Sequence, residues 1–279
     1  MQLVLFFVLT FIVSWSAFFT AAVLSRVASV PFASTPLSGA VYLVGVFTPG
    51  LIALALSGQQ GGRAAIVALL RRVMKIPPNS WWFLFAIAYI VVIKLLATLL
   101  HRLFAGTWPN PGDTPLILML IATVISTPVQ SGEEIGWRAY ALPRLSARIG
   151  LARSSIVLGI IWAVWHLPFF FIPGTDKSGQ SLPLYLLQVT ALSVALSWVY
   201  WRTDQSLLTA MLMHAAVNNL KDIVPSAVTG TTRAISFHGS LIGWLTVAVL
   251  WICAVYFLIQ MRNQKFQAAD QQISAGHHI

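Results

Sequence analysis

The stretch Gly132-Glu133-Glu134-Ile135-Gly136-Trp137-Arg138 stands at the end of an apolar run that extends from Leu116 to Val129. Seven of the 279 residues are acidic, and Glu133 and Glu134 are the only glutamates. Carboxylates at membrane depth are costly and are seldom kept without a task. This adjacent pair therefore marks a candidate functional site, and the rest of the sequence is read for what surrounds it.

The composition is that of a membrane protein. Hydrophobic residues make up 58% of the chain and charged residues only 9%, whereas about 25% of the residues in a soluble domain are charged. Apolar runs of about 20 residues, the length of a transmembrane helix, recur along the whole chain. We therefore predict an all-α polytopic membrane protein, with about eight transmembrane helices in one bundle and a polar cavity in its cytoplasmic half.

The apolar runs predict eight spans in chain order. They are Leu3–Leu24, Gly39–Leu56, Trp81–Leu100, Pro115–Trp137, Ser154–Ile172, Leu184–Trp201, Ser206–Leu220 and Leu241–Met261. We expect the fourth span to continue as helix until Pro143, and the short seventh span to be buried among other helices.

The spans form one membrane domain with three expected parts. Residues 1–112 hold the first three spans, residues 113–220 hold the candidate site, and residues 221–279 hold the last span and a cytoplasmic tail.

The distribution of Lys and Arg predicts the orientation. Eleven of these residues fall on the side of the eight-span arrangement that carries both termini, and five fall on the other. Cytoplasmic loops are enriched in Lys and Arg, so both termini are predicted to be cytoplasmic. Lys94 lies within the third span, where we expect it to snorkel towards the interface. This loop pattern accounts for the net charge of +10 without a nucleic-acid partner.

Three further polar residues lie inside predicted spans: His166 in the fifth, and His214 and Asn218 in the seventh. Helical spacing of four places His214 and Asn218 on one face, and likewise stacks Trp162 with His166 and Glu134 with Arg138. A rise of about 1.5 Å per residue puts Glu133, His166 and His214 about 13, 18 and 12 Å from the cytoplasmic ends of their spans. This similar depth predicts a single site.

The residue types in this set allow two kinds of hydrolytic chemistry. A carboxylate beside a histidine can deprotonate a water molecule, while a second histidine and an asparagine stabilise the oxyanion of a tetrahedral intermediate. Alternatively, Glu133, His166 and His214 form a ligand set for a divalent metal such as zinc. The serine-hydrolase Gly-x-Ser-x-Gly and the zinc motif His-Glu-x-x-His are absent, and no Asp lies inside a span.

The motifs resemble those of one protease family. Glu133-Glu134 followed by Arg138 resembles the Glu-Glu-x-x-x-Arg motif of type II CAAX prenyl endopeptidase-like proteins, grouped with CAAX proteases and bacteriocin-processing (Abi) proteins as the CPBP family. His214 and Asn218 match its later His-x-x-x-Asn motif. Trp162 stands where the family usually has Phe, four residues before His166. The motifs cover about a third of the chain.

The resemblance implies an intramembrane endopeptidase of a bacterial or archaeal cell membrane, described in this family as a metalloprotease or as a glutamate-dependent protease. Its substrate would be a lipidated or membrane-embedded peptide. Glu133 and His166 would activate water, Glu134 and Arg138 would orient the site with Trp162, and His214 with Asn218 would form the oxyanion site. Two other readings of the residues stay open, a bacteriocin-immunity or peptide-binding membrane protein and a proton-coupled transporter. The sequence does not predict an oligomeric state.

Overall fold

The computed structural model describes residues 2–226, 234–237 and 239–266. Arg233, and the predicted tail beyond residue 266, lie outside the described residues. Within those ranges the regular structure is entirely helical, which confirms the predicted all-α class. The α-helices are α1 (Gln2–Val27), α2 (Pro36–Val73), α3 (Trp81–Ala105), α4 (Leu116–Ser126), α5 (Ser131–Glu134), α6 (Leu142–Ile149), α7 (Leu151–Trp165), α8 (Leu182–Arg202), α9 (Leu207–Leu220) and α10 (Leu241–Met261). The tighter or wider helical segments are η1 (Thr127–Gln130), η2 (Ile135–Ala141), η3 (Leu167–Phe170) and η4 (Lys221–Ile223).

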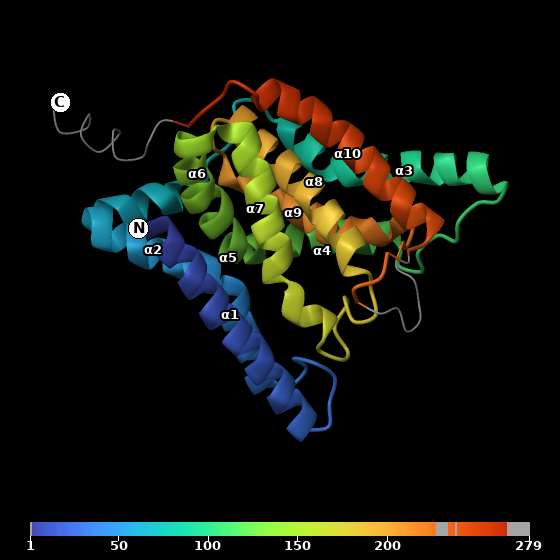
Figure 1. Cartoon of the computed structure of the whole chain (residues 1–279), viewed down its shortest axis with the longest axis horizontal. Helices are drawn as coiled ribbons and strands as arrows, with labels where there is room; N and C mark the ends of the chain where they lie inside the picture. The colour runs from blue at the N-terminus through green and yellow to red at the C-terminus, as the bar shows by residue number, and fades with distance from the viewer. Residues whose placement is uncertain (1, 227–233, 238, 267–279) are drawn as a thin grey trace.

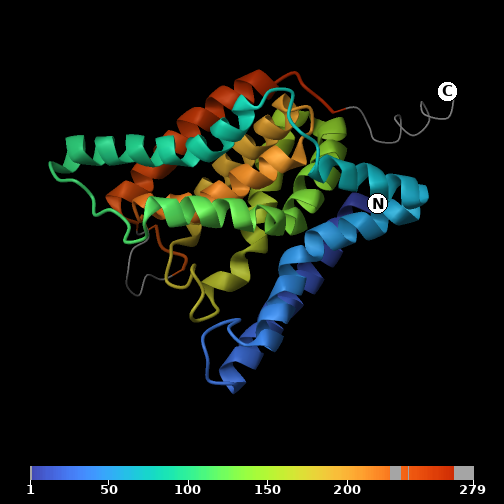
Figure 2. The same cartoon turned by 180° about the vertical axis from the view of Figure 1, so that it is seen from behind.

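Each predicted span coincides with a helix or a composite helix, so the polytopic architecture is confirmed. Among the described residues, six helical stretches are long and apolar enough to cross a membrane, and α7 and α9 are shorter. Residues of α9 are buried at 10 of its 14 positions, because α9 packs among α3, α4 and α8. The two views show this short helix inside the bundle, while the α1–α2 hairpin leans away from it (Figures 1 and 2). The predicted burial of the seventh span is thus confirmed.

The helix that carries the acidic pair departs from α-helical winding twice. It passes from α4 through the 3₁₀ segment η1 into α5, widens into the π-helix η2, and ends only with α6 at Ile149. The expected end at Pro143 was wrong. Pro143 has no N–H to give to the preceding turn, but Arg72 donates to the Ala139 carbonyl at 3.3 Å and Arg144 to the Tyr140 carbonyl at 3.1 Å. These arginines satisfy carbonyls of the wide turn, and the helix continues.

Glycines set how closely α2 approaches this composite helix. A Cβ at Gly136 would lie 2.6 Å from the Cβ and backbone carbon of Pro49, and one at Gly132 would lie 2.9 Å from the Cα of Phe47. Side chains essentially never tolerate such distances from backbone atoms, so both positions require glycine. The backbone of α2 therefore packs directly against α5 and η2. This contact fixes the position of the acidic pair, which lies between the two glycines in the sequence.

Lys94 does not snorkel, in contrast to the prediction. Its residue exposure is 1%, and its Nζ donates to the Val224 carbonyl at 2.8 Å and to the Ser226 hydroxyl at 3.0 Å. A buried ammonium needs such partners to offset its lost hydration. Lys94 in α3 thereby holds the segment that follows α9 against the bundle.

The connecting loops gather at two opposite ends of the bundle. At one end, Lys75 pairs with Asp204 at 2.6 Å, and the Leu151 N–H donates to the Gln264 carbonyl close to the end of α10. At the other end, the Gly112 N–H donates to the Ile223 carbonyl, and Gly174 approaches Phe32. The α1–α2, α3–α4 and α7–α8 connections belong to this second end, as do the described residues that follow α9.

Candidate active site

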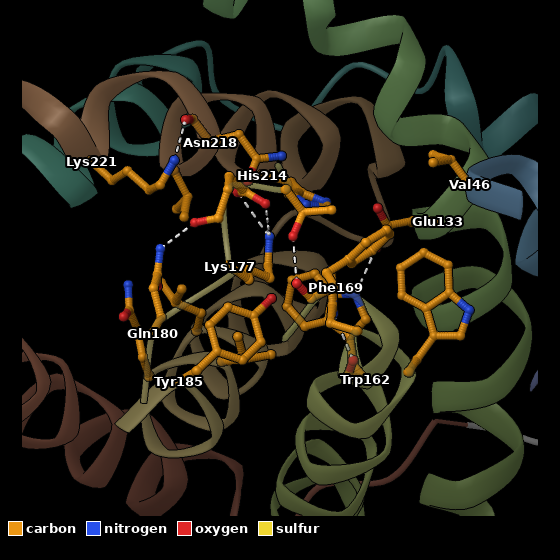
Figure 3. Close-up of a pocket in the computed structure, with 18 of the residues that line it drawn as sticks. Val46, Glu133, Trp162, Phe169, Lys177, Gln180, Tyr185, His214, Asn218 and Lys221 are labelled. Atoms are coloured by element: carbon orange, nitrogen blue, oxygen red, sulfur yellow. Dashed lines mark hydrogen bonds and ion pairs between the residues drawn. The ribbon is translucent and has the colours of Figure 1, made fainter. Parts of the chain in front are cut away.

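The two adjacent glutamates have different surroundings. Glu133 is 7% exposed and lines a cavity of about 500 Å³, and its Oε2 accepts a hydrogen bond of 2.6 Å from the Trp162 indole N–H. Glu134 has no exposed surface and does not line the cavity. Consecutive helical residues point about 100° apart, so one backbone turn sends one carboxylate into the cavity and the other into the protein. Figure 3 shows Glu133 at the edge of this cavity.

One carboxylate oxygen of Glu134 interacts with two side chains, those of Arg138 and His214. Its Oε1 accepts from Arg138 Nη1 at 3.0 Å and lies 2.8 Å from His214 Nδ1. Arg138 is fully buried, one turn further along the helix, and its guanidinium carbon lies 4.4 Å from the centre of the Trp162 ring. The predicted Glu134–Arg138 pair is therefore formed. Through Arg138 and His214, this carboxylate fixes groups that surround Trp162 and the cavity.

His166 closes the last turn of α7 at the edge of the cavity. Its Nδ1 lies 2.8 Å from the Trp162 carbonyl, which can only accept a hydrogen bond, so Nδ1 carries the proton in the neutral ring. The unprotonated nitrogen is then Nε2. The Trp162 and His166 rings lie 5.7 Å apart between centres, which agrees with their predicted stacking on one helix face.

His214 and Asn218 lie one turn apart on α9, and both line the cavity. The His214 ring is 5.1 Å from the Trp162 ring, centre to centre, in an edge-to-face arrangement. The Asn218 amide donates to Gln130 Oε1 at 3.4 Å. The structure thus gathers Glu133, Trp162, His166, His214 and Asn218 around one cavity, with Glu134 and Arg138 behind them.

The cavity also has residues that were not predicted. Gln130 comes from the 3₁₀ segment η1, Tyr42 from α2 and Tyr185 from α8. Asp176 and Lys177 come from the connection between η3 and α8. This connection is rich in Gly and Pro and has no periodicity, so the sequence indicated only a loop there.

The cavity lies closer to one end of the bundle than expected. The loop residues that line it, Phe32, Thr175 and Asp222 among them, belong to the end opposite the Lys75–Asp204 pair. If the termini are cytoplasmic, as the basic residues predict, this mouth faces away from the cytoplasm. The expected cytoplasmic half was based on depths counted from Leu142, Ser154 and Ser206. The fourth helix continues to Ile149, which puts Glu133 about 24 Å rather than 13 Å from that end.

The residues predicted as metal ligands are Glu133, His166 and His214. Among the described residues, no group of three or more His, Cys, Asp or Glu side chains is arranged to hold a metal ion. The Oε2 of Glu133 and the Nδ1 of His166 are engaged by Trp162, and the Nδ1 of His214 is engaged by Glu134. These hydrogen bonds leave Oε1 of Glu133 and Nε2 of the two histidines as the atoms that could reach a metal, but in this arrangement the three residues do not form a three-donor site.

Comparison with known proteins agrees with the motifs. Residues 113–220 match the family model described as type II CAAX prenyl endopeptidase Rce1-like. Over 250 residues, which cover 83% of this chain and 87% of the relative, the chain is 24% identical to CAAX prenyl protease 2 of Methanococcus maripaludis. These matches support an intramembrane endopeptidase, and with the apolar helices they indicate an integral membrane protein.

The matched segment contains every site residue predicted from the sequence, from Glu133 in α5 to Asn218 in α9. The broader grouping with Abi proteins and the metalloprotease class stay predictions. The resemblance predicted from the motifs is confirmed: over residues 113–220 this chain is similar to the Rce1-like type II CAAX prenyl endopeptidases.

Proposed function

We propose that this protein is an intramembrane endopeptidase in which Glu133 and His166 activate the water that attacks a peptide bond. The observation that carries the proposal is the separation of the two glutamates. Glu133 faces a cavity of about 500 Å³ lined by both histidines, while Glu134 is buried against Arg138 and His214. A carboxylate held at a cavity wall, with one oxygen fixed by an indole N–H, is suited to accept a proton from water.

The proposed reaction uses only groups around this cavity. Glu133 takes one proton from water while Nε2 of His166 accepts a hydrogen bond from the other O–H, and the water oxygen forms a bond with the carbonyl carbon of the substrate. The resulting oxyanion receives hydrogen bonds from the Asn218 amide and from the His214 ring. The Glu134 carboxylate lies 2.8 Å from His214 Nδ1 and holds this ring in position. When the carbon–nitrogen bond breaks, the proton passes to the leaving amine.

The proposed substrate is a lipidated peptide. The Methanococcus relative carries the name CAAX prenyl protease, and a CaaX sequence ends a chain with a prenylated cysteine followed by three residues. Three aromatic residues that line the cavity and contact one another, Phe32, Tyr42 and Phe169, offer apolar surface to such a substrate. The division of the chain into residues 1–112, the protease core 113–220 and residues 221–279 is part of the same proposal.

Glu133→Gln tests the role of the carboxylate. We expect kcat/KM to fall by about 10²–10⁴-fold, the usual contribution of a general base, with little change in the midpoint of thermal unfolding. Cleavage of a fluorogenic peptide with a farnesylated cysteine and three following residues is measured with the protein in liposomes. Asp204→Asn, the same change in a surface pair at the other end, serves as the matched control and should keep full activity.

Undiminished cleavage by the Glu133→Gln protein would overturn the proposal. Wild-type protein that binds the peptide tightly but never cleaves it would instead favour the peptide-binding alternative.

A further inference from the structure

Lys177 is an ammonium held inside the cavity rather than in open solvent. Its side chain is 15% exposed, and its Nζ lies 5.4 Å from the centre of the Tyr185 ring and 5.7 Å from that of Phe169. Its Nζ donates to both carboxylate oxygens of its ion-pair partner Asp176, to Oδ1 at 3.0 Å and to Oδ2 at 2.9 Å. Lysine is rarely kept so enclosed without a partner or a task. Figure 3 shows Lys177 among the cavity residues, with Tyr185 and Gln180 beside it.

Lys221 supplies a second ammonium at the same mouth. It follows α9 directly, donates to the Asn218 carbonyl at 3.1 Å, and lies 3.2 Å from Asp222 Oδ2. Asn218 and Lys221 stand four and seven residues after His214, a spacing that places all three along one helical face. This row of three side chains therefore runs from the proposed oxyanion site to the cavity mouth.

We propose that Lys177 and Lys221 together bind the C-terminal carboxylate of the peptide segment that the enzyme releases. This inference rests on the proposed function and adds to it the recognition of a free chain terminus. It assigns the cavity to substrates whose scissile bond lies a short, fixed distance before their last residue.

The distance along α9 agrees with such a segment. Seven residues of helix from His214 to Lys221 rise about 10 Å. Three residues of extended chain also span about 10 Å. A peptide whose scissile carbonyl lies at His214 and Asn218 can therefore place the carboxylate of its third following residue at Lys221.

The existing acidic partners of both lysines are easily exchanged. The side chains of Asp176 and Asp222 are 63% and 56% exposed, so water can solvate either carboxylate when a substrate carboxylate takes its place. Burial raises the pKa of Asp176, but the charge and hydrogen bond of Lys177, and then the charge of Lys221, outweigh this effect and leave the pKa lowered. Both lysines thus act on one carboxylate at the mouth.

The test compares lipidated peptides that differ only in their last group. A farnesylated peptide with three residues after the cysteine is assayed as the free acid and as the C-terminal amide. Wild-type protein should show a KM about tenfold or more higher for the amide, the size expected for a lost charge-assisted hydrogen bond, with little change in kcat. Lys177→Gln and Lys221→Gln should raise KM for the acid and leave the amide unchanged. Lys75→Gln, in the exposed pair at the other end, is the matched control.

Two further arms separate the possible failures. An amidated peptide ending in Asp carries its carboxylate on a side chain, and a KM restored by it would overturn recognition of the chain terminus. Binding of acid and amide to Glu133→Gln protein, followed by fluorescence anisotropy, tests the inference without catalysis. Equal affinity for the two forms would refute the lysine pair, whereas a clear preference for the acid without wild-type cleavage would refute only the proposed protease activity.

Discussion

At the scale of single residues, substitution of Glu134 should have a different effect from substitution of Glu133, because Glu134 belongs to a buried cluster with Arg138 and His214. Glu134→Gln would leave the guanidinium of Arg138 buried without its carboxylate, because both side chains have no exposed surface. Removal of one partner of a buried pair costs about 3–5 kcal/mol. We therefore expect the midpoint of thermal unfolding to fall by about 10 °C, together with loss of activity.

Arg138→Met in the same protein separates stability from catalysis. The double variant Glu134→Gln, Arg138→Met removes the unpaired charge, so it should recover much of the unfolding midpoint while cleavage stays low. Additive losses of stability in the double variant would show that the two groups are not coupled. Scanning calorimetry or a thermal-shift assay in detergent gives the three midpoints.

The sequence predicts which site residues are neighbours when they lie one helical turn apart, but not when they come from different parts of the chain. Glu134 with Arg138, and His214 with Asn218, were predictable because a spacing of four on one helix determines which side chains are neighbours. Gln130 was not, because it reaches Asn218 only through the 3₁₀ turn of η1. Lys177 was not, because its position depends on the path of a loop. Lys94 was misjudged, since its partners at Val224 and Ser226 come from a distant part of the chain.

At the scale of elements, the direct packing of α2 on the π-helix η2 gives the next prediction. Gly136→Ala would force the new Cβ against the backbone of Pro49, and overpacking of this kind costs about 1–3 kcal/mol. Displacement of η2 would also move Glu133, so we expect both the unfolding midpoint and kcat/KM to fall. Gly58→Ala is the matched control, because its Cβ would meet only the end of the Ile66 side chain, at 3.0 Å.

Ala by itself favours a helix over Gly by up to about 1 kcal/mol. A Gly136→Ala protein as stable and active as the wild type would therefore show that α2 can move away without effect on the site. The existence of α2 and of the acidic helix was predictable from apolar runs. The π-turn was not, because it depends on Arg72 and Arg144 binding carbonyls near Pro143.

At the scale of the whole molecule, the basic residues and the position of the cavity together predict the side from which substrate enters. The end opposite the cavity carries most of the Lys and Arg residues, among them Arg63, Arg71 and Arg202. Positive charge in loops is retained in the cytoplasm. The cavity mouth, with Lys177 and Lys221, should then face the exterior or periplasmic side. The composition was sufficient to predict membrane spans and charge bias, but the location of the mouth required the folded arrangement of three loops.

Labelling of single cysteines tests this orientation. In a Cys253→Ala background, Ser178→Cys places an exposed thiol in the loop at the cavity mouth, and Ser80→Cys places one in the loop before α3 at the other end. A membrane-impermeant maleimide added to intact cells should modify Ser178→Cys at once. It should modify Ser80→Cys only after the membrane is permeabilised. The reverse pattern would place the termini outside and open the cavity to the cytoplasm, and the loop charges would then have predicted the wrong orientation.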